Sequence, residues 1–193
     1  YTPTPWFPIP WNRDQLETFD RLPTLGYLHR PTYIKLTDAD GQPLARRSER
    51  VAALVAGWSK ALETLPETQR KTALKRVISS TGENPDKLIE LTALLDAQAE
   101  AGGPELRVDK PNEWINLEPR LGNTGSASWF MGMALGVMGS YIDGGVSAAI
   151  NLRNDREASL IFISPPAPEK IEKQGRGVFK NNVTPAIDPA NYR

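Results

Sequence analysis

The stretch that decides the fold is residues 146–164, VSAAINLRNDREASLIFIS. It predicts two strands, 146–153 and 158–164, joined as a β-hairpin around Asn154-Asp155. In the second strand, residues 160–163 are all apolar, so both of its faces need cover from solvent. Such a strand is typical of the centre of a three-layer arrangement, in which helices lie on both sides of a sheet.

Three long helices are predicted before this hairpin. The first starts at Ser48 and is ended by Pro66, and the second starts at Asn84, where a capping side chain precedes a proline. The second ends at 102–103, a pair of glycines, and the third covers about 126–142. In the first helix, apolar residues at helical spacing form one buried stripe: Val51, Leu54, Val55, Trp58 and Leu62.

The third helix contains three glycines, Gly132, Gly136 and Gly139. Each costs helix stability by about 1 kcal/mol relative to alanine. Their spacings of four and three place them on one side of the helix. We therefore expect this side to pack closely against a sheet or another helix.

The remaining elements are shorter. Residues 25–36 predict a strand that Pro31 interrupts, which favours an edge strand or a bend. Residues 73–79 predict a half-buried strand, residues 12–22 a short helix, and residues 105–125 mostly loop. Because strands alternate with helices and the last two strands form a hairpin, the sequence predicts an α/β fold with a mixed β-sheet and helices on both faces.

The chain is expected to contain one domain. Residues 1–11 predict an extended arm rich in proline and aromatic residues, residues 12–166 a single α/β domain, and residues 167–193 an extended or disordered tail. Proline-rich arms are thus expected at both ends. The chain begins at Tyr1, without methionine, and we interpret it as a fragment or a processed form.

The composition narrows the possible functions. Lys plus Arg and Asp plus Glu both number 23, so the zero net charge gives no reason to expect nucleic acid or an anionic membrane as a partner. There is no cysteine and only one histidine, so cysteine nucleophiles and Cys-ligated metals are excluded, and we expect no metal or cofactor. No apolar run reaches the ~18 residues of a membrane span, and no signal peptide is visible.

The segment RLGNTGS at 120–126 is a candidate anion site, because glycines before a helix start expose backbone N–H groups. The candidate residues are Arg120, Gly122, Asn123, Thr124, Gly125 and Ser126. The alternative is a glycine-bent loop with a capping Ser or Thr, which needs no ligand. The segment lacks the Lys-Ser/Thr ending of a P-loop and the spacing of a dinucleotide fingerprint.

No catalytic constellation stands out. Ser126 and Ser128 do not lie in a G-x-S-x-G motif, and His29 is interpreted as a hydrogen-bonded histidine near a sheet edge. No spacing of acidic residues predicts a buried pair. Arg153 and Arg156 flank the hairpin turn and are expected on its solvated rim. An enzyme of unknown type remains an alternative.

Several short segments between about Pro3 and Pro166 are distinctive when they are taken together. They are Pro5-Trp-Phe-Pro-Ile-Pro-Trp11, Phe19-Asp20, Leu25-Gly-Tyr-Leu-His-Arg-Pro31, Gly41-Gln-Pro-Leu44, Ala56-Gly-Trp58, Arg120-Leu-Gly-Asn-Thr-Gly125, Gly144-Gly145, Asn151-Leu-Arg153 and Ser164-Pro-Pro166. In their order along the chain, these segments resemble the C-terminal region of the type VI secretion lipase adapter family. Residues 67–113 and the tail after 168 match least. The family usually has a further N-terminal part with a membrane-proximal hydrophobic segment, which is not seen in this chain.

The resemblance implies a non-catalytic adapter that binds a phospholipase effector and aids its loading onto the secretion spike. It implies the cytoplasm as the place of action, and it transfers no catalytic residue. Aromatic and arginine side chains commonly anchor such interfaces, so the candidate partner-binding residues are Trp6, Phe7, Trp11, His29 and Arg30. A domain that binds a small anion through residues 120–126 is the alternative function.

Overall fold

The computed structural model describes residues 12–20, 22–70, 74–107 and 110–174. The chain divides into two compact units. One is Leu25–Pro166, which holds the whole described sheet, and the other groups Tyr1–Thr24 with Ala167–Arg193. The α/β unit thus begins at residue 25, whereas the sequence predicts a domain start at residue 12.

The sheet is mixed and contains six strands in the described part of the chain. Its order is β1-β6-β5-β3-β4, and β2 pairs with β6 on the same side as β1. β3 is parallel to both β4 and β5, and the other pairs are antiparallel. The strands are β1 Tyr27–Leu28, β2 Thr32–Lys35, β3 Leu74–Ser80, β4 Trp114–Asn116, β5 Val146–Asn151 and β6 Glu157–Ser164.

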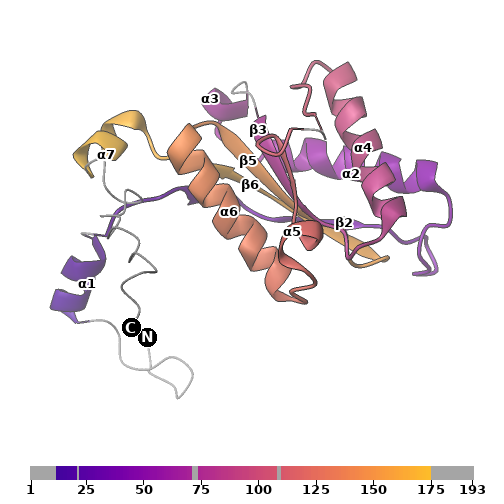
Figure 1. Ribbon diagram of the computed structural model, residues 1–193, viewed down its shortest axis with the longest axis horizontal. Coiled ribbons are helices and arrows are strands. Elements are labelled where there is room, and N and C mark those ends of the chain that lie inside the picture. Colours follow the sequence, from indigo (N-terminus) through magenta and orange to yellow (C-terminus); the bar gives the residue numbers. More distant parts are fainter. Residues whose placement is uncertain (1–11, 21, 71–73, 108–109, 175–193) are drawn as a thin grey trace, which may run out of the picture. The chain divides into compact units, whose positions relative to one another are not determined.

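Helices cover both faces of this sheet (Figure 1). α2 and α4 pack on one face and α6 on the other, which confirms the predicted three-layer α/β fold. The two single-turn helices α3 and α5 lie in connections. The helices of this unit are α2 Arg47–Leu62, α3 Glu67–Arg70, α4 Pro85–Glu100, α5 Glu118–Leu121 and α6 Ala127–Asp143.

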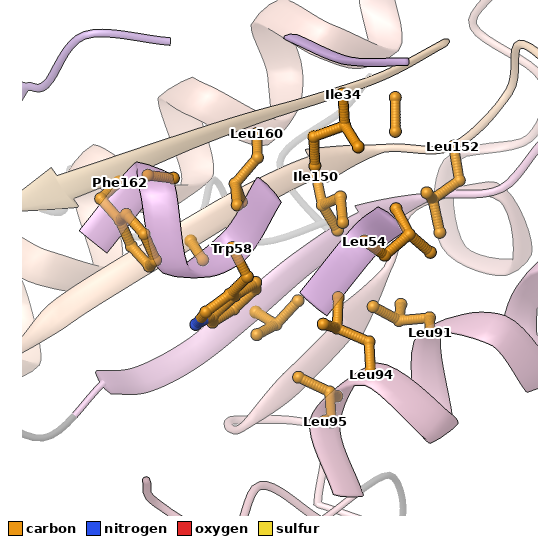
Figure 2. Close-up of a cluster of buried hydrophobic side chains, with 14 of the residues drawn as sticks. Ile34, Leu54, Trp58, Leu91, Leu94, Leu95, Ile150, Leu152, Leu160 and Phe162 are labelled. Carbon is orange, nitrogen blue, oxygen red and sulfur yellow. The ribbon is translucent and has the colours of Figure 1, made fainter. Parts of the chain in front are cut away.

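The predicted hairpin forms as β5 and β6, and β6 lies inside the sheet between β5 and the β1–β2 edge. Leu160 and Phe162 point to the side of α2 and α4, where Trp58 meets Phe162 edge to face with ring centroids 5.2 Å apart (Figure 2). Ile161 and Ile163 point to the opposite side, under α6. The four-residue apolar run is therefore divided between two cores.

The first strand region forms the sheet edge, as the proline predicts. β1 pairs with the end of β6 and β2 with its beginning, and Pro31 lies in the break between them. Proline lacks the N–H that a continuous ladder needs, so the pairing stops there and resumes at Thr32.

One expectation needs correction: β3 is buried on both faces, not half buried, because helices cover it from both sides. Residues 105–125 are mostly loop, as predicted, but they also contain β4 and α5. β4 has only three residues, too few to show the alternation of apolar and polar side chains that predicts a strand. Its Trp114 is buried, and the indole Nε1 donates to Ser79 Oγ of β3 at 2.8 Å.

The start of α4 and the glycines of α6 behave as the sequence predicts, whereas α2 starts at Arg47 and already ends at Leu62, before Pro66. Asn84 Oδ1 accepts from the Asp86 backbone N–H at 2.9 Å and caps α4. In α6, a Cβ on Gly136 would lie 2.4 Å from Ile163 Cδ1, and one on Gly139 would lie 2.9 Å from Arg76 Cδ. The glycines therefore let α6 approach the sheet closely.

Buried charges fasten α2, α4 and the hairpin turn. Arg50 Nε donates to Glu90 Oε1 at 2.6 Å, and the exposed side-chain fractions are 8% and 6%. Arg50 Nη1 also donates to the Asp155 carbonyl at 2.9 Å, while the Asp155 carboxylate pairs with Lys87 at 2.6 Å. Spacing along the sequence does not reveal the burial of Glu90, because its partner cation comes from a different helix.

The second unit contains α1 Arg13–Asp20 and α7 Pro168–Lys173. A capping box starts α1, since Asn12 and Gln15 each donate a backbone N–H to the other's side chain. The prediction of an extended or disordered tail from residue 167 is wrong for α7, where Pro168 occupies the first turn. The predicted arm at 1–11 and the tail beyond residue 174 lie outside the described residues.

Replacing Gly136 with valine should lower the free energy of unfolding by about 1–3 kcal/mol, because the added side chain would overlap that of fully buried Ile163. The matched control is Ala134→Val, which is exposed on the same helix and should cost less than about 1 kcal/mol. Urea unfolding of both variants measures the difference. Equal stability of Gly136→Val and the unmodified chain would contradict the close approach of α6.

Replacing Glu90 with glutamine should cost about 3–5 kcal/mol, because Arg50 would remain buried without a counter-charge. The double variant Arg50→Met/Glu90→Leu should recover most of this loss, since no charge is then buried at that place. Urea unfolding at neutral pH provides both values. A single variant that costs under about 1 kcal/mol would show that the pair is not shielded from water.

Candidate functional site

The predicted anion loop lies at the carboxyl ends of the parallel strands β3 and β4. The chain leaves β3 toward α4 on one face and leaves β4 toward α6 on the other. Ligands of open α/β sheets commonly bind at such a point. The loop at 120–126 therefore has the right position in the fold for a ligand site.

The hydrogen-bond donors at the carboxyl end of β3 bind a carboxylate of the chain itself, that of Glu118. Glu118 Oε1 accepts from Ser80 Oγ at 2.5 Å and from the Gly82 backbone N–H at 3.1 Å. Its Oε2 accepts from the Thr81 backbone N–H at 3.1 Å. Burial acts to raise the pKa of Glu118, but these three hydrogen bonds together outweigh it, and the pKa lies below its ordinary value.

The loop itself is held by Arg153. Its Nη2 donates to Asn123 Oδ1 at 2.7 Å, and its Nη1 donates to the Gly125 carbonyl at 3.1 Å and to Ser128 Oγ at 2.9 Å. Thr124 Oγ1 and Ser128 Oγ lie 2.6 Å apart. The prediction that Arg153 lies on a solvated rim is thus wrong, whereas Arg156 is exposed.

The other predicted anion residues stand at the surface. Arg120 and Gly122 are exposed, and Ser126 precedes α6 without a side-chain cap hydrogen bond. Gly122 and Gly125 have positive φ angles of 71° and 60°, which glycine tolerates. Anion binding by this loop stays a prediction, and the described hydrogen bonds explain its conformation without a ligand.

The predicted partner-binding residues fall into two groups. Trp6, Phe7 and Trp11 lie outside the described residues. His29 Nε2 lies 2.8 Å from Ser164 Oγ, and the Thr64 backbone also bonds the ring. Burial lowers the pKa of His29, and the Thr64 hydrogen bond opposes this shift. The hydrogen bonds of His29 therefore hold the edge strand against β6 and the end of α2. Arg30 is exposed and lies beside an open groove.

The structure does not bring the candidate serine Ser128 to the single histidine. Ser128 bonds Thr124 and Arg153, whereas His29 bonds Ser164 at the sheet edge. Among the residues that the structure describes, no group of three or more His, Asp or Glu side chains could hold a metal ion. In the same residues, no helix is long and apolar enough to cross a bilayer.

α6 has an exposed apolar face that is not predicted from the sequence. The signal for it is the absence of any charged side chain from residues 127–142. One side of α6 packs on the sheet through Gly132, Gly136 and Ser140. The opposite side is exposed and carries only apolar residues at helical spacing: Ala127, Phe130, Ala134, Met138 and Ile142. We call these five residues the α6 face.

Two exposed residues of the edge strands lie on the same side of the sheet as α6. Leu28 pairs with Ile163, whose side chain packs under α6. Tyr33 neighbours Ile34, which packs in the α2–α4 core, so Tyr33 points to the opposite side because successive side chains of a strand alternate. The exposed fractions are 54% for Leu28 and 63% for Tyr33.

The opposite layer has a different surface. α2 and α4 expose mainly charged and polar side chains, and Ile89 is their one large exposed apolar residue in the described chain. The exposed charged residues there include Arg47, Glu49, Lys60, Asp86, Asp96 and Glu100. The large exposed apolar residues of the described α/β unit are therefore concentrated on the α6 side of the sheet.

A comparison with protein families gives one match that covers most of the chain. The family model described as type VI lipase adapter protein Tla3, C-terminal, matches residues 25–165. These bounds almost coincide with the compact unit Leu25–Pro166. The match therefore covers the sheet, the buried Glu118 and the α6 face together.

Replacing Glu118 with glutamine should lower the free energy of unfolding by about 1.5–3 kcal/mol at pH 7, because hydrogen bonds to a charged acceptor are lost. Since the folded-state pKa is below the ordinary 4.5, the carboxylate stabilises the fold above pH 4.5 and loses this effect as the pH falls through the folded-state pKa. Urea unfolding at several pH values should show the two proteins converging in acid. A constant difference would mean that the ionised form makes no special contribution.

Proposed function

Because the chain belongs to the family of the type VI lipase adapter protein Tla3, C-terminal, we propose that it is a non-catalytic adapter that binds a phospholipase effector. The observation that carries the proposal is the match over residues 25–165, which spans the α/β unit from end to end. The name of the family contains both the class of partner and the role.

The described side chains are consistent with a binding role. The buried acids Glu90 and Glu118 each have a partner that fixes them in the fold, and the single histidine bonds a serine at the sheet edge. A non-catalytic adapter needs a stable scaffold and an exposed surface for its partner. The three-layer fold supplies the first, and the α6 side of the sheet supplies the second.

Loading onto the secretion spike is the second part of the proposal. An adapter that delivers an effector has to contact the effector and the spike at once, so it needs two separate surfaces. The charged outer side of α2 and α4 and the apolar outer side of α6 lie on opposite faces of the sheet, which fits this requirement. We place the loading step in the cytoplasm, where effectors are made.

The test is co-purification of the tagged chain with a type VI phospholipase effector and the spike protein, expressed together. We expect a stoichiometric complex of chain and phospholipase, to which the spike adds. Burial of roughly 1,200–2,000 Å² is typical of a stable complex, so it should survive gel filtration. A folded chain that elutes alone from mixtures with each candidate phospholipase would contradict the proposal.

Catalysis is tested on the same material. The chain alone should release no fatty acid from phospholipid vesicles, and the phospholipase alone should. The Glu118→Gln variant is the informative control, because Glu118 is a buried acid with a shifted pKa. Lipid hydrolysis by the unmodified chain would overturn the non-catalytic assignment, and its absence in a Glu118→Gln variant that is shown to be folded would point to Glu118 as the acid involved.

A further inference from the structure

The α6 face needs a protein partner of a particular size. A helix of 17 residues is about 25 Å long and about 10 Å wide, so its outer side offers on the order of 250 Å². A stable interface buries roughly 800 Å² on each partner. The α6 face can therefore form only the apolar centre of a larger interface, and Leu28 and Tyr33 extend it along the same side of the sheet.

Two other occupants fit this face poorly. Pairing of two copies through α6 alone would bury about 500 Å² in total, well below the ~1,200 Å² of a stable interface. A helix that lies on a membrane carries Lys and Arg along its polar flank, but residues 127–142 contain neither, and the chain has no net charge. A second protein remains the occupant that the chemistry favours.

The face also restricts the partner's chemistry. A charged side chain of the partner that lay against residues 127–142 would lose its hydration and gain no counter-charge. The surface of the partner that meets the α6 face therefore has to be apolar. A lipase takes acyl chains out of a lipid surface, and such chains are received by apolar walls. The enzyme must therefore expose an apolar surface where it meets lipid.

We propose that the α6 face covers the lipid-contacting surface of the phospholipase, so that the adapter and the bilayer compete for the same part of the enzyme. This inference rests on the proposed function, and it adds both the contact region and its consequence. The bound phospholipase is kept from membranes until the adapter leaves. Phe130 is the central anchor, because it is an aromatic residue exposed by 67%.

The experiment measures fatty-acid release from phosphatidylglycerol vesicles by the phospholipase that co-purifies with the chain. Saturating unmodified chain should reduce the rate at least tenfold. Phe130→Asp and Ile142→Asp should each weaken binding of the phospholipase at least tenfold and restore vesicle hydrolysis at the same concentration. Both side chains are exposed, so these variants should keep the unfolding midpoint of the unmodified chain.

The matched control is Ile89→Asp, which places the same charge on α4, on the other face of the sheet, at a residue exposed by 47%. It should bind and inhibit like the unmodified chain. Equal binding by the two α6 variants and the control would overturn the assignment of the α6 face. Weakened binding that is confined to Phe130→Asp and Ile142→Asp would support it.

The remaining outcomes separate this inference from the proposed function. A chain that binds the phospholipase and leaves vesicle hydrolysis unchanged overturns the inference alone. A chain that binds no phospholipase overturns both. Flotation of the chain alone with the vesicles, or a dimer of the chain that Phe130→Asp dissociates, also overturns the inference, because the face would then have another occupant.

Discussion

The fold depends on one strand that is apolar on both faces. Leu160 and Phe162 of β6 require cover on one side and Ile161 and Ile163 on the other, so the sheet cannot be exposed to water on either face. α2 and α4 together supply the first layer, whereas α6 alone supplies the second. A single helix reaches the sheet closely only because its inner residues are small, which explains Gly136 against Ile163.

The unequal helical cover of the two sheet faces also explains where the proposed partner-binding surface lies. Two helices bury one face of the sheet and turn charged side chains outward, while α6 is apolar on its outer side as well as its inner side. A helix that is apolar all round is normally buried. We propose that the outer side of α6 is covered by another molecule, the lipase that the name of the matching family contains.

The sequence predicted those features that short-range physics determines. Pro31 indicates the edge of the sheet, and Asn84 indicates the start of a helix. The apolar run in β6 requires helices on both faces of the sheet. It did not predict β4, which is too short to show a pattern, or the partners of Glu90 and Glu118, which come from distant elements. The α6 face was readable from its lack of charge, but only the structure shows which side of the helix remains exposed.

We propose that the phospholipase docks on the α6 side of the sheet. Hydrogen exchange of the backbone amides, measured for the chain alone and in complex with the phospholipase, tests this docking site. Docking there should slow the exchange in the complex at residues 27–35 and 127–143, with no change along α4. Slower exchange confined to α2 and α4, with α6 unaffected, would contradict it.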